Sequence, residues 1–89
     1  MGTLWLESDD FGARWGDVPD SASEKILDKA TTLIGSPHAV TTAWTRPGNG
    51  QFLIARDQVH TFWNHASEAQ VDEITDVATE LLGEPDTVA

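Results

Sequence analysis

Residues 67–83 give the strongest structural signal in this chain. Apolar residues recur there at steps of three and four, with others beside them: Val71, Ile74, Val77, Ala78, Leu81 and Leu82. This period predicts an amphipathic helix with one apolar face. Ser67 followed by Gln70 has the spacing of a capping box, so a new helix is expected to begin at this serine.

The same segment has a line of acidic side chains. Glu68, Asp72, Asp76 and Glu80 recur at steps of four, Glu73 lies beside them, and no Lys or Arg interrupts the line. Like charges at this spacing cost an isolated helix roughly 0.2–0.5 kcal/mol per pair. Either a partner favours the line, or it is a solvated face that keeps the protein soluble.

Length and charge limit what the chain can be. Its 89 residues indicate one small domain, and the absence of cysteine excludes disulfides and thiolate metal sites. The N-terminus lacks the features of a signal peptide, and no run is long enough to span a membrane, so we expect a soluble, cytoplasmic protein. The formal net charge is −10, with eight acids and no Lys or Arg in residues 57–89. Such a charge disfavours direct binding to nucleic acid or to an anionic membrane, and it favours a basic partner.

The first third of the chain predicts a strand and two helices. Residues 3–7 are apolar and aromatic and favour a strand. Ser8 followed by acids suggests a short helix over residues 9–15, with Phe11 and Trp15 on one face. Ser21 and Glu24 have the capping-box spacing, so residues 21–34 form a second predicted helix, which Gly35 and Pro37 end.

The middle of the chain predicts a β-hairpin. Residues 39–46 alternate and are rich in β-branched side chains, residues 47–50 are a Pro- and Gly-rich turn, and residues 51–56 form the return strand. Residues 59–64 favour a third strand, although their spacing also fits a helix. In both cases Val59, Phe62 and Trp63 are expected in the core.

These elements predict an α+β fold. A hairpin or three-stranded antiparallel sheet packs against two main helices in a single domain of residues 1–89, with a loose tail at residues 84–89.

No constellation in the sequence indicates catalysis or metal binding. His38, His60 and His65 are the only histidines, and no pair of them has the spacing of a zinc helix. His65, Glu68 and Asp72 could approach one another near a helix start, but polar surface residues explain them more simply. We therefore expect no enzyme, no metal and no cofactor. An enzyme would need a pocket lined by His60, His65 or Asp72.

Tryptophan and the acids supply the candidate binding residues. Most of the four tryptophans are expected in the core of so small a domain. Trp44 is the candidate for an exposed anchor, because its predicted strand face also holds Thr42 and Arg46. The predicted partner-binding residues are Trp44 and the acids of the last helix: Glu68, Asp72, Glu73, Asp76 and Glu80.

Two resemblances add to this interpretation. Residues 4–34 (LWLESDDFGARWG…ASEKILDKATTLI) resemble the first elements of small tailed-phage head–tail connector proteins. As a small, acidic, Trp-rich α+β chain, the protein is also similar in general character to bacterial immunity proteins and antitoxins. The sequence thus predicts a non-enzymatic module that inhibits or neutralises a basic protein. An assembly adaptor and a nucleic-acid mimic are the alternatives, and the oligomeric state is open.

Overall fold

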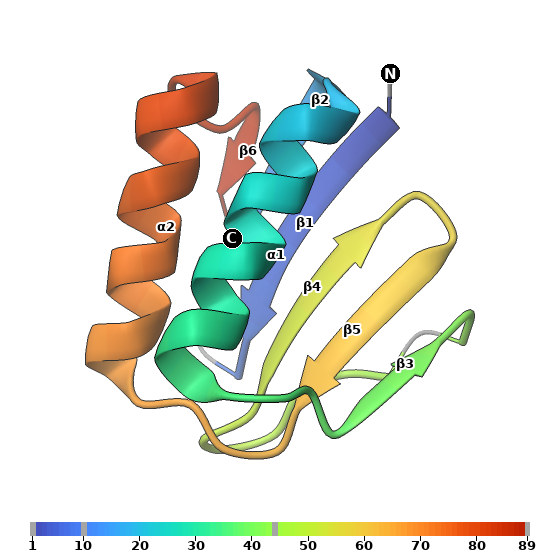
Figure 1. Cartoon of the computed structure of the whole chain (residues 1–89), viewed down its shortest axis with the longest axis vertical. Coiled ribbons are helices and arrows are strands. Elements are labelled where there is room, and N and C mark those ends of the chain that lie inside the picture. The colour runs from blue at the N-terminus through green and yellow to red at the C-terminus, as the bar shows by residue number, and fades with distance from the viewer. Residues whose placement is uncertain (1, 10, 44, 89) are drawn as a thin grey trace.

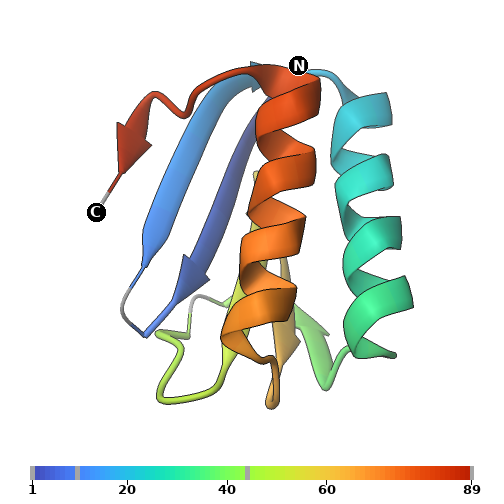
Figure 2. The same ribbon diagram turned by 90° about the vertical axis from the view of Figure 1, so that its left-hand side faces the viewer.

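The structure is a computed structural model, and it describes residues 2–9, 11–43 and 45–88. Within these residues the chain forms, in order, β1 (Gly2–Ser8), β2 (Gly12–Val18), α1 (Asp20–Ile34), β3 (Ala39–Thr41), β4 (Phe52–Arg56), β5 (Val59–Trp63), α2 (Glu68–Leu82) and β6 (Thr87–Val88). The strands form one six-stranded sheet in the order β3-β5-β4-β1-β2-β6, and every neighbouring pair is antiparallel. Both helices lie on the same face of this sheet (Figures 1 and 2). The predicted α+β class is confirmed.

The core lies between the sheet and the two helices. Alternate residues of β1, Leu4 and Leu6, point towards the helices and are fully buried, whereas Trp5 between them is 37% exposed. Ile26 of α1 and Ile74 of α2 meet this surface from the other side and are fully buried. The period of two in the strand and of three to four in the helices therefore produces the two-layer packing.

Two buried tryptophans fix the ends of the helices. The indole N–H of Trp63 in β5 donates to the carbonyl oxygen of Gly35, which ends α1, over 2.9 Å. Trp15 in β2 donates in the same way to Gly83, which ends α2, over 3.0 Å. Both glycines have a positive φ, which a residue with a side chain rarely adopts. The indoles bind carbonyl groups that the helices themselves leave without partners.

The predicted short helix at residues 9–15 is wrong. Residues 12–15 belong to β2 instead, and just before this strand the N–H of Ser8 donates to the carbonyl of Phe11 over 2.7 Å. Ala13 and Trp15 are buried while Arg14 between them is exposed, which is the period of a strand. The four-residue spacing of Phe11 and Trp15 suggested a helical face, but pairing with β1 outweighs it.

The predicted hairpin is also wrong in its pairing. Only Ala39–Thr41 form a strand, and this strand pairs with β5, whereas β4 lies between β5 and β1. Residues 42–51, apart from residue 44, instead run across the face of the sheet that lies away from the helices (Figures 1 and 2). Pro47 is buried there, as are Leu53 and Phe62 on this face of β4 and β5. A covering loop thus replaces a paired strand.

The third strand at residues 59–64 is confirmed, since β5 pairs with β4 through a tight turn at Asp57. Phe62 and Trp63 are buried as predicted, but Val59 is 46% exposed, because it lies beside the turn of that hairpin, where it pairs with Arg56. The two-residue strand β6 pairs with β2 in the tail that was expected to be loose. The carboxylate of Asp86 accepts a hydrogen bond from the N–H of Gly16 over 2.7 Å, which holds the tail on the sheet.

Both main helices are confirmed, and their ends differ from the predictions in detail. The capping box of Ser67 and Gln70 is present at the start of α2. The one predicted at Ser21 is absent, because α1 begins one residue earlier, at Asp20, with Pro19 in the capping position. On the apolar face of α2, Leu81 is 42% exposed, and Leu82 packs against the core instead.

Candidate functional site

The acidic side chains of α2 form a continuous exposed surface. We call Glu68, Asp72, Glu73, Asp76 and Glu80 the acidic face, and all five are exposed. The apolar residues of the same helix, Val71, Ile74 and Ala78, are buried against the sheet and α1. The core therefore holds the helix in one orientation, and this orientation directs the acidic face into solvent.

Nothing in the described part of the chain neutralises the acidic face. None of its five carboxylates forms an ion pair with a Lys, Arg or His side chain among the described residues. The last turn of α2 holds no basic residue, so Glu80 lies near the negative end of the helix dipole. Three like-charge pairs at i,i+4 together cost roughly 1 kcal/mol. Among the described residues, no ion pair compensates for this cost.

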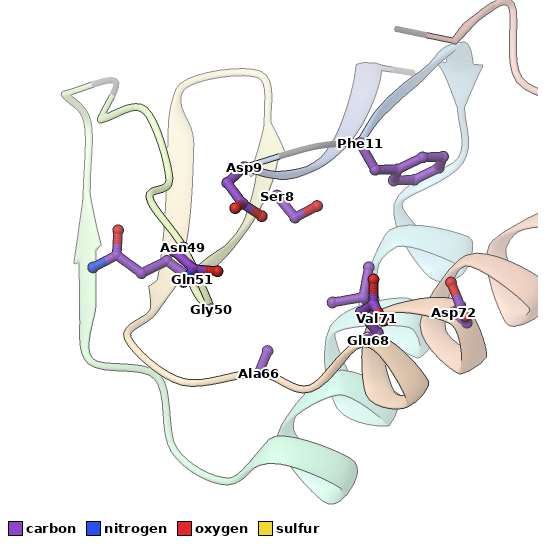
Figure 3. A pocket seen from close by; sticks show the side chains of 10 residues that line it. All are labelled: Ser8, Asp9, Phe11, Asn49, Gly50, Gln51, Ala66, Glu68, Val71 and Asp72. Carbon is purple, nitrogen blue, oxygen red and sulfur yellow. The ribbon is translucent and has the colours of Figure 1, made fainter.

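A pocket of about 460 Å³ opens at the N-terminal end of the acidic face. Three segments form its walls: the β1–β2 connection, the loop before β4, and the start of α2 (Figure 3). The residues that line this acidic pocket are Ser8, Asp9 and Phe11, residues 49–51, and Ala66, Glu68, Val71 and Asp72. Its size lies within the roughly 300–1,000 Å³ of typical ligand sites.

Hydrogen bonds tie two of these walls, the loop before β4 and the start of α2, to the fold. The N–H of Ala66 donates to the carbonyl of Gly50 over 2.8 Å, which joins the loop to the chain entering α2. The side-chain amide of Gln51 donates to Asn64 over 3.3 Å, and that of Gln70 donates to the carbonyl of Leu33 in α1 over 2.7 Å. These two walls of the pocket are therefore held in place in the free protein.

The lining of the pocket combines negative charge with an apolar floor. Its carboxylates come from Asp9, on one side, and from Glu68 and Asp72 of α2, on the other (Figure 3). All three are exposed, whereas Val71 is buried and Phe11 is half-buried. The lining includes no Lys, Arg or His. A positively charged group with an apolar portion matches this lining.

The structure thus unites some of the predicted site residues and separates others. Glu68 and Asp72 belong both to the acidic face and to the acidic pocket, while Asp76 and Glu80 lie further along α2. The prediction for Trp44 lies outside the described residues. A pocket lined by His60, His65 or Asp72 would have indicated an enzyme. Asp72 lines the acidic pocket, whereas His60 and His65 do not.

Sequence reasoning missed Asp9 and Phe11. Both were assigned to a short helix, so their position opposite α2 was not foreseen. The only sequence signal for this position was the pair of aspartates that follows the predicted strand at residues 3–7, because such pairs also occur in turns.

A second group of charged and aromatic residues lies on the sheet face away from the helices. The guanidinium carbon of Arg14 lies 5.7 Å from the centroid of the Trp5 ring, within the range of a cation–π contact. On the same face, burial raises the pKa of the Glu7 carboxyl above its usual value, and the charge of Arg46 partly opposes this shift. Positive and negative groups are mixed here, so this face favours neither an acidic nor a basic partner.

A metal cluster and a membrane-spanning helix are both absent from the described residues. No group of three or more His, Asp or Glu side chains in that part of the chain could hold a metal ion. Neither α1 nor α2 has both the length and the apolar character needed to cross a membrane, and the described residues include no other α-helix.

Comparison with known proteins gives no further assignment, because no family model, curated protein or solved structure matches this chain. The function must therefore be inferred from the chain's own surface.

Proposed function

We propose that this protein is a non-enzymatic cytoplasmic module that binds a basic protein through the acidic face of α2, in the manner of an inhibitor, immunity protein or antitoxin. The observation behind the proposal is that five exposed carboxylates lie on one rigid helix and have no ion-pair partner in the described part of the chain. A complementary basic surface would supply that partner, and it would also speed association through electrostatic steering.

The stability cost of the acidic face supports a binding role over solubility alone. Solubility needs net charge, which the chain already has at −10, but it does not need like charges aligned at i,i+4. Alignment destabilises α2 and concentrates the negative potential along one line. Sites that sacrifice stability for function have this character.

The non-enzymatic part of the proposal is supported by the exposure of the pocket carboxylates. Asp9, Glu68 and Asp72 are all exposed, and exposed acids lack the burial that tunes a catalytic group.

Mimicry of nucleic acid is the second candidate, and the spacing of the acids favours it. Glu68, Asp72, Asp76 and Glu80 follow one another at about 6 Å along the helix axis, since four residues rise about 1.5 Å each. This step is comparable with the phosphate spacing of a DNA strand. A basic partner that normally binds DNA would then be blocked by competition.

A charge-matched pair of variants tests the proposal. The first variant neutralises the acidic face with Glu68→Gln, Asp72→Asn, Asp76→Asn and Glu80→Gln. The control makes the same change in charge elsewhere, at four other exposed acids: Asp17→Asn, Glu24→Gln, Asp28→Asn and Glu84→Gln. Each protein is immobilised, and proteins captured from a lysate of the source organism are quantified by mass spectrometry at low and at high salt.

We expect a basic protein to be captured by the wild type and by the control, and to be lost with the acidic-face variant and at high salt. The acidic-face variant should also be at least as stable as the wild type, because like-charge repulsion is removed. Release of the captured protein by added duplex DNA would favour mimicry. Equal capture by both variants, or capture that is insensitive to salt, would contradict the proposal.

A further inference from the structure

We propose that the acidic pocket is the specificity site of the acidic face, and that it accepts one arginine side chain of the basic partner. This inference rests on the proposed function, since the partner must be the same basic protein. It adds a defined contact, because the acidic face alone explains attraction to any positive surface, whereas a pocket selects a particular side chain.

The charge of the pocket calls for a cation. Three carboxylates stand around its rim, and none of its lining residues is basic. Asp9 faces Glu68 and Asp72 across the opening, so a positive group between them would contact acids on both sides (Figure 3). The pocket would repel an anion. A purely apolar group would leave the carboxylates of the rim without a positive partner.

The shape and floor of the pocket favour arginine over lysine. Val71 is 7% exposed and Phe11 is half-buried, and together they give an apolar surface for the stem of a long side chain. A guanidinium is planar, can bind two carboxylates at once and stacks on an aromatic ring such as Phe11. An ammonium group is a more strongly hydrated point charge, and it gains less from such a site.

The pocket also has the rigidity that selection requires. The bonds from Ala66 to Gly50 and from Gln51 to Asn64 join two of its walls. The capping box of Ser67 and Gln70 fixes the first turn of α2, from which Glu68 points. Little conformational freedom is therefore lost when the pocket is filled, and this favours binding.

The experiment uses the ¹⁵N-labelled full chain and two small probes, Nα-acetyl-L-arginine amide and Nα-acetyl-L-lysine amide. Each probe is titrated at constant ionic strength while amide shifts are followed by NMR. Three variants accompany the wild type: Asp9→Asn changes the pocket only, Phe11→Leu removes the aromatic ring, and Glu24→Gln makes a matched change in charge outside both the pocket and the acidic face. Thermal denaturation verifies that each variant is folded.

We expect saturable shifts with the arginine probe around Ser8–Asp9, Gly50–Gln51 and the start of α2, and weaker binding of the lysine probe. Asp9→Asn should weaken arginine binding about five-fold, a factor that corresponds to roughly 1 kcal/mol at 25 °C. Phe11→Leu should weaken it as well, and Glu24→Gln should leave it within about two-fold. Shifts spread evenly along α2, or equal binding of the two probes, would overturn the inference.

The capture experiment separates this inference from the proposed function. If a basic partner requires the acidic face but is captured equally by Asp9→Asn, the pocket inference fails and the proposed function stands. If the arginine probe fills the pocket but capture is insensitive to the acidic face, the proposed function fails and the pocket remains an arginine-binding site.

Discussion

Replacing Trp63 with phenylalanine tests how the sheet holds the end of α1. Trp63 is 1% exposed, and its indole N–H donates to the carbonyl of Gly35 over 2.9 Å. Phenylalanine cannot donate, so that carbonyl loses its partner at a cost of about 1–3 kcal/mol. The smaller ring also leaves space in the core, which adds part of the roughly 3–5 kcal/mol measured when a buried tryptophan is cut to alanine. Together these effects predict a loss of roughly 2–4 kcal/mol in the free energy of unfolding.

Urea denaturation followed by far-ultraviolet circular dichroism measures this loss without relying on tryptophan fluorescence. Trp5→Phe is the matched control, because Trp5 is 37% exposed and a phenylalanine there keeps a ring beside Arg14. The control should change stability by no more than about 0.5 kcal/mol. If Trp63→Phe is as mild as the control, the indole does not hold the end of α1, and the reasoning is refuted.

Two further predictions concern the start of α2 and the open face of the sheet. Ser67→Ala removes the capping box and should lower the free energy of unfolding by about 0.5–2 kcal/mol. Ser21→Ala, which removes no cap bond, should cost nothing in the same urea titration, and equal losses would contradict the assignment of the caps. Because burial raises the pKa of Glu7, the folded state holds this proton more tightly than the unfolded state does. The stabilisation of the folded state by this tighter proton binding is complete below the usual pKa of 4.5. It is lost as the pH rises through the higher pKa of the folded state. The melting temperature of the wild type minus that of Glu7→Gln should therefore fall as the pH rises across this window. If this difference rises instead, the charge of Arg46 outweighs the effect of burial on the pKa of Glu7.

The two proposals assign different tasks to different parts of α2. The whole acidic face supplies long-range attraction, which salt weakens. The acidic pocket at its N-terminal end, where Glu68 and Asp72 meet Asp9, supplies a short-range contact of defined shape. Under the two proposals, a small domain keeps an acidic line that costs it stability because the line attracts the partner and the pocket selects it.

The helices could be predicted because their signals are local. The apolar period, the capping box of Ser67 and Gln70, and the glycines at the helix ends all lie within a few residues of the structure they specify. The strands at residues 3–7, 51–56 and 59–64 could be located for the same reason. The segment at residues 9–15 was misread because Phe11 and Trp15 satisfy a helical spacing, while the alternation of Ala13, Arg14 and Trp15 spans too few residues to outweigh it.

The candidate site divides in the same way. Exposure of the acidic face follows from the helical period, because residues that alternate with a buried apolar face must point to solvent. The acidic pocket does not follow from any local pattern. It exists because β1 lies between β2 and β4, and this placement brings Asp9 and Phe11 opposite a helix that begins almost sixty residues later.

By itself, the sequence determined the two amphipathic helices, most of the strands, the acidic face of α2 and the α+β class, since each depends on periodicity and on residues close in the chain. Only the tertiary structure decided which strands pair, that residues 45–51 cover the sheet instead of joining it, and that Asp9 meets Glu68 and Asp72 around a pocket. The physical reason is that strand pairing depends on contacts between distant segments. Their free energy is set by the burial of the whole core and not by any one stretch of residues.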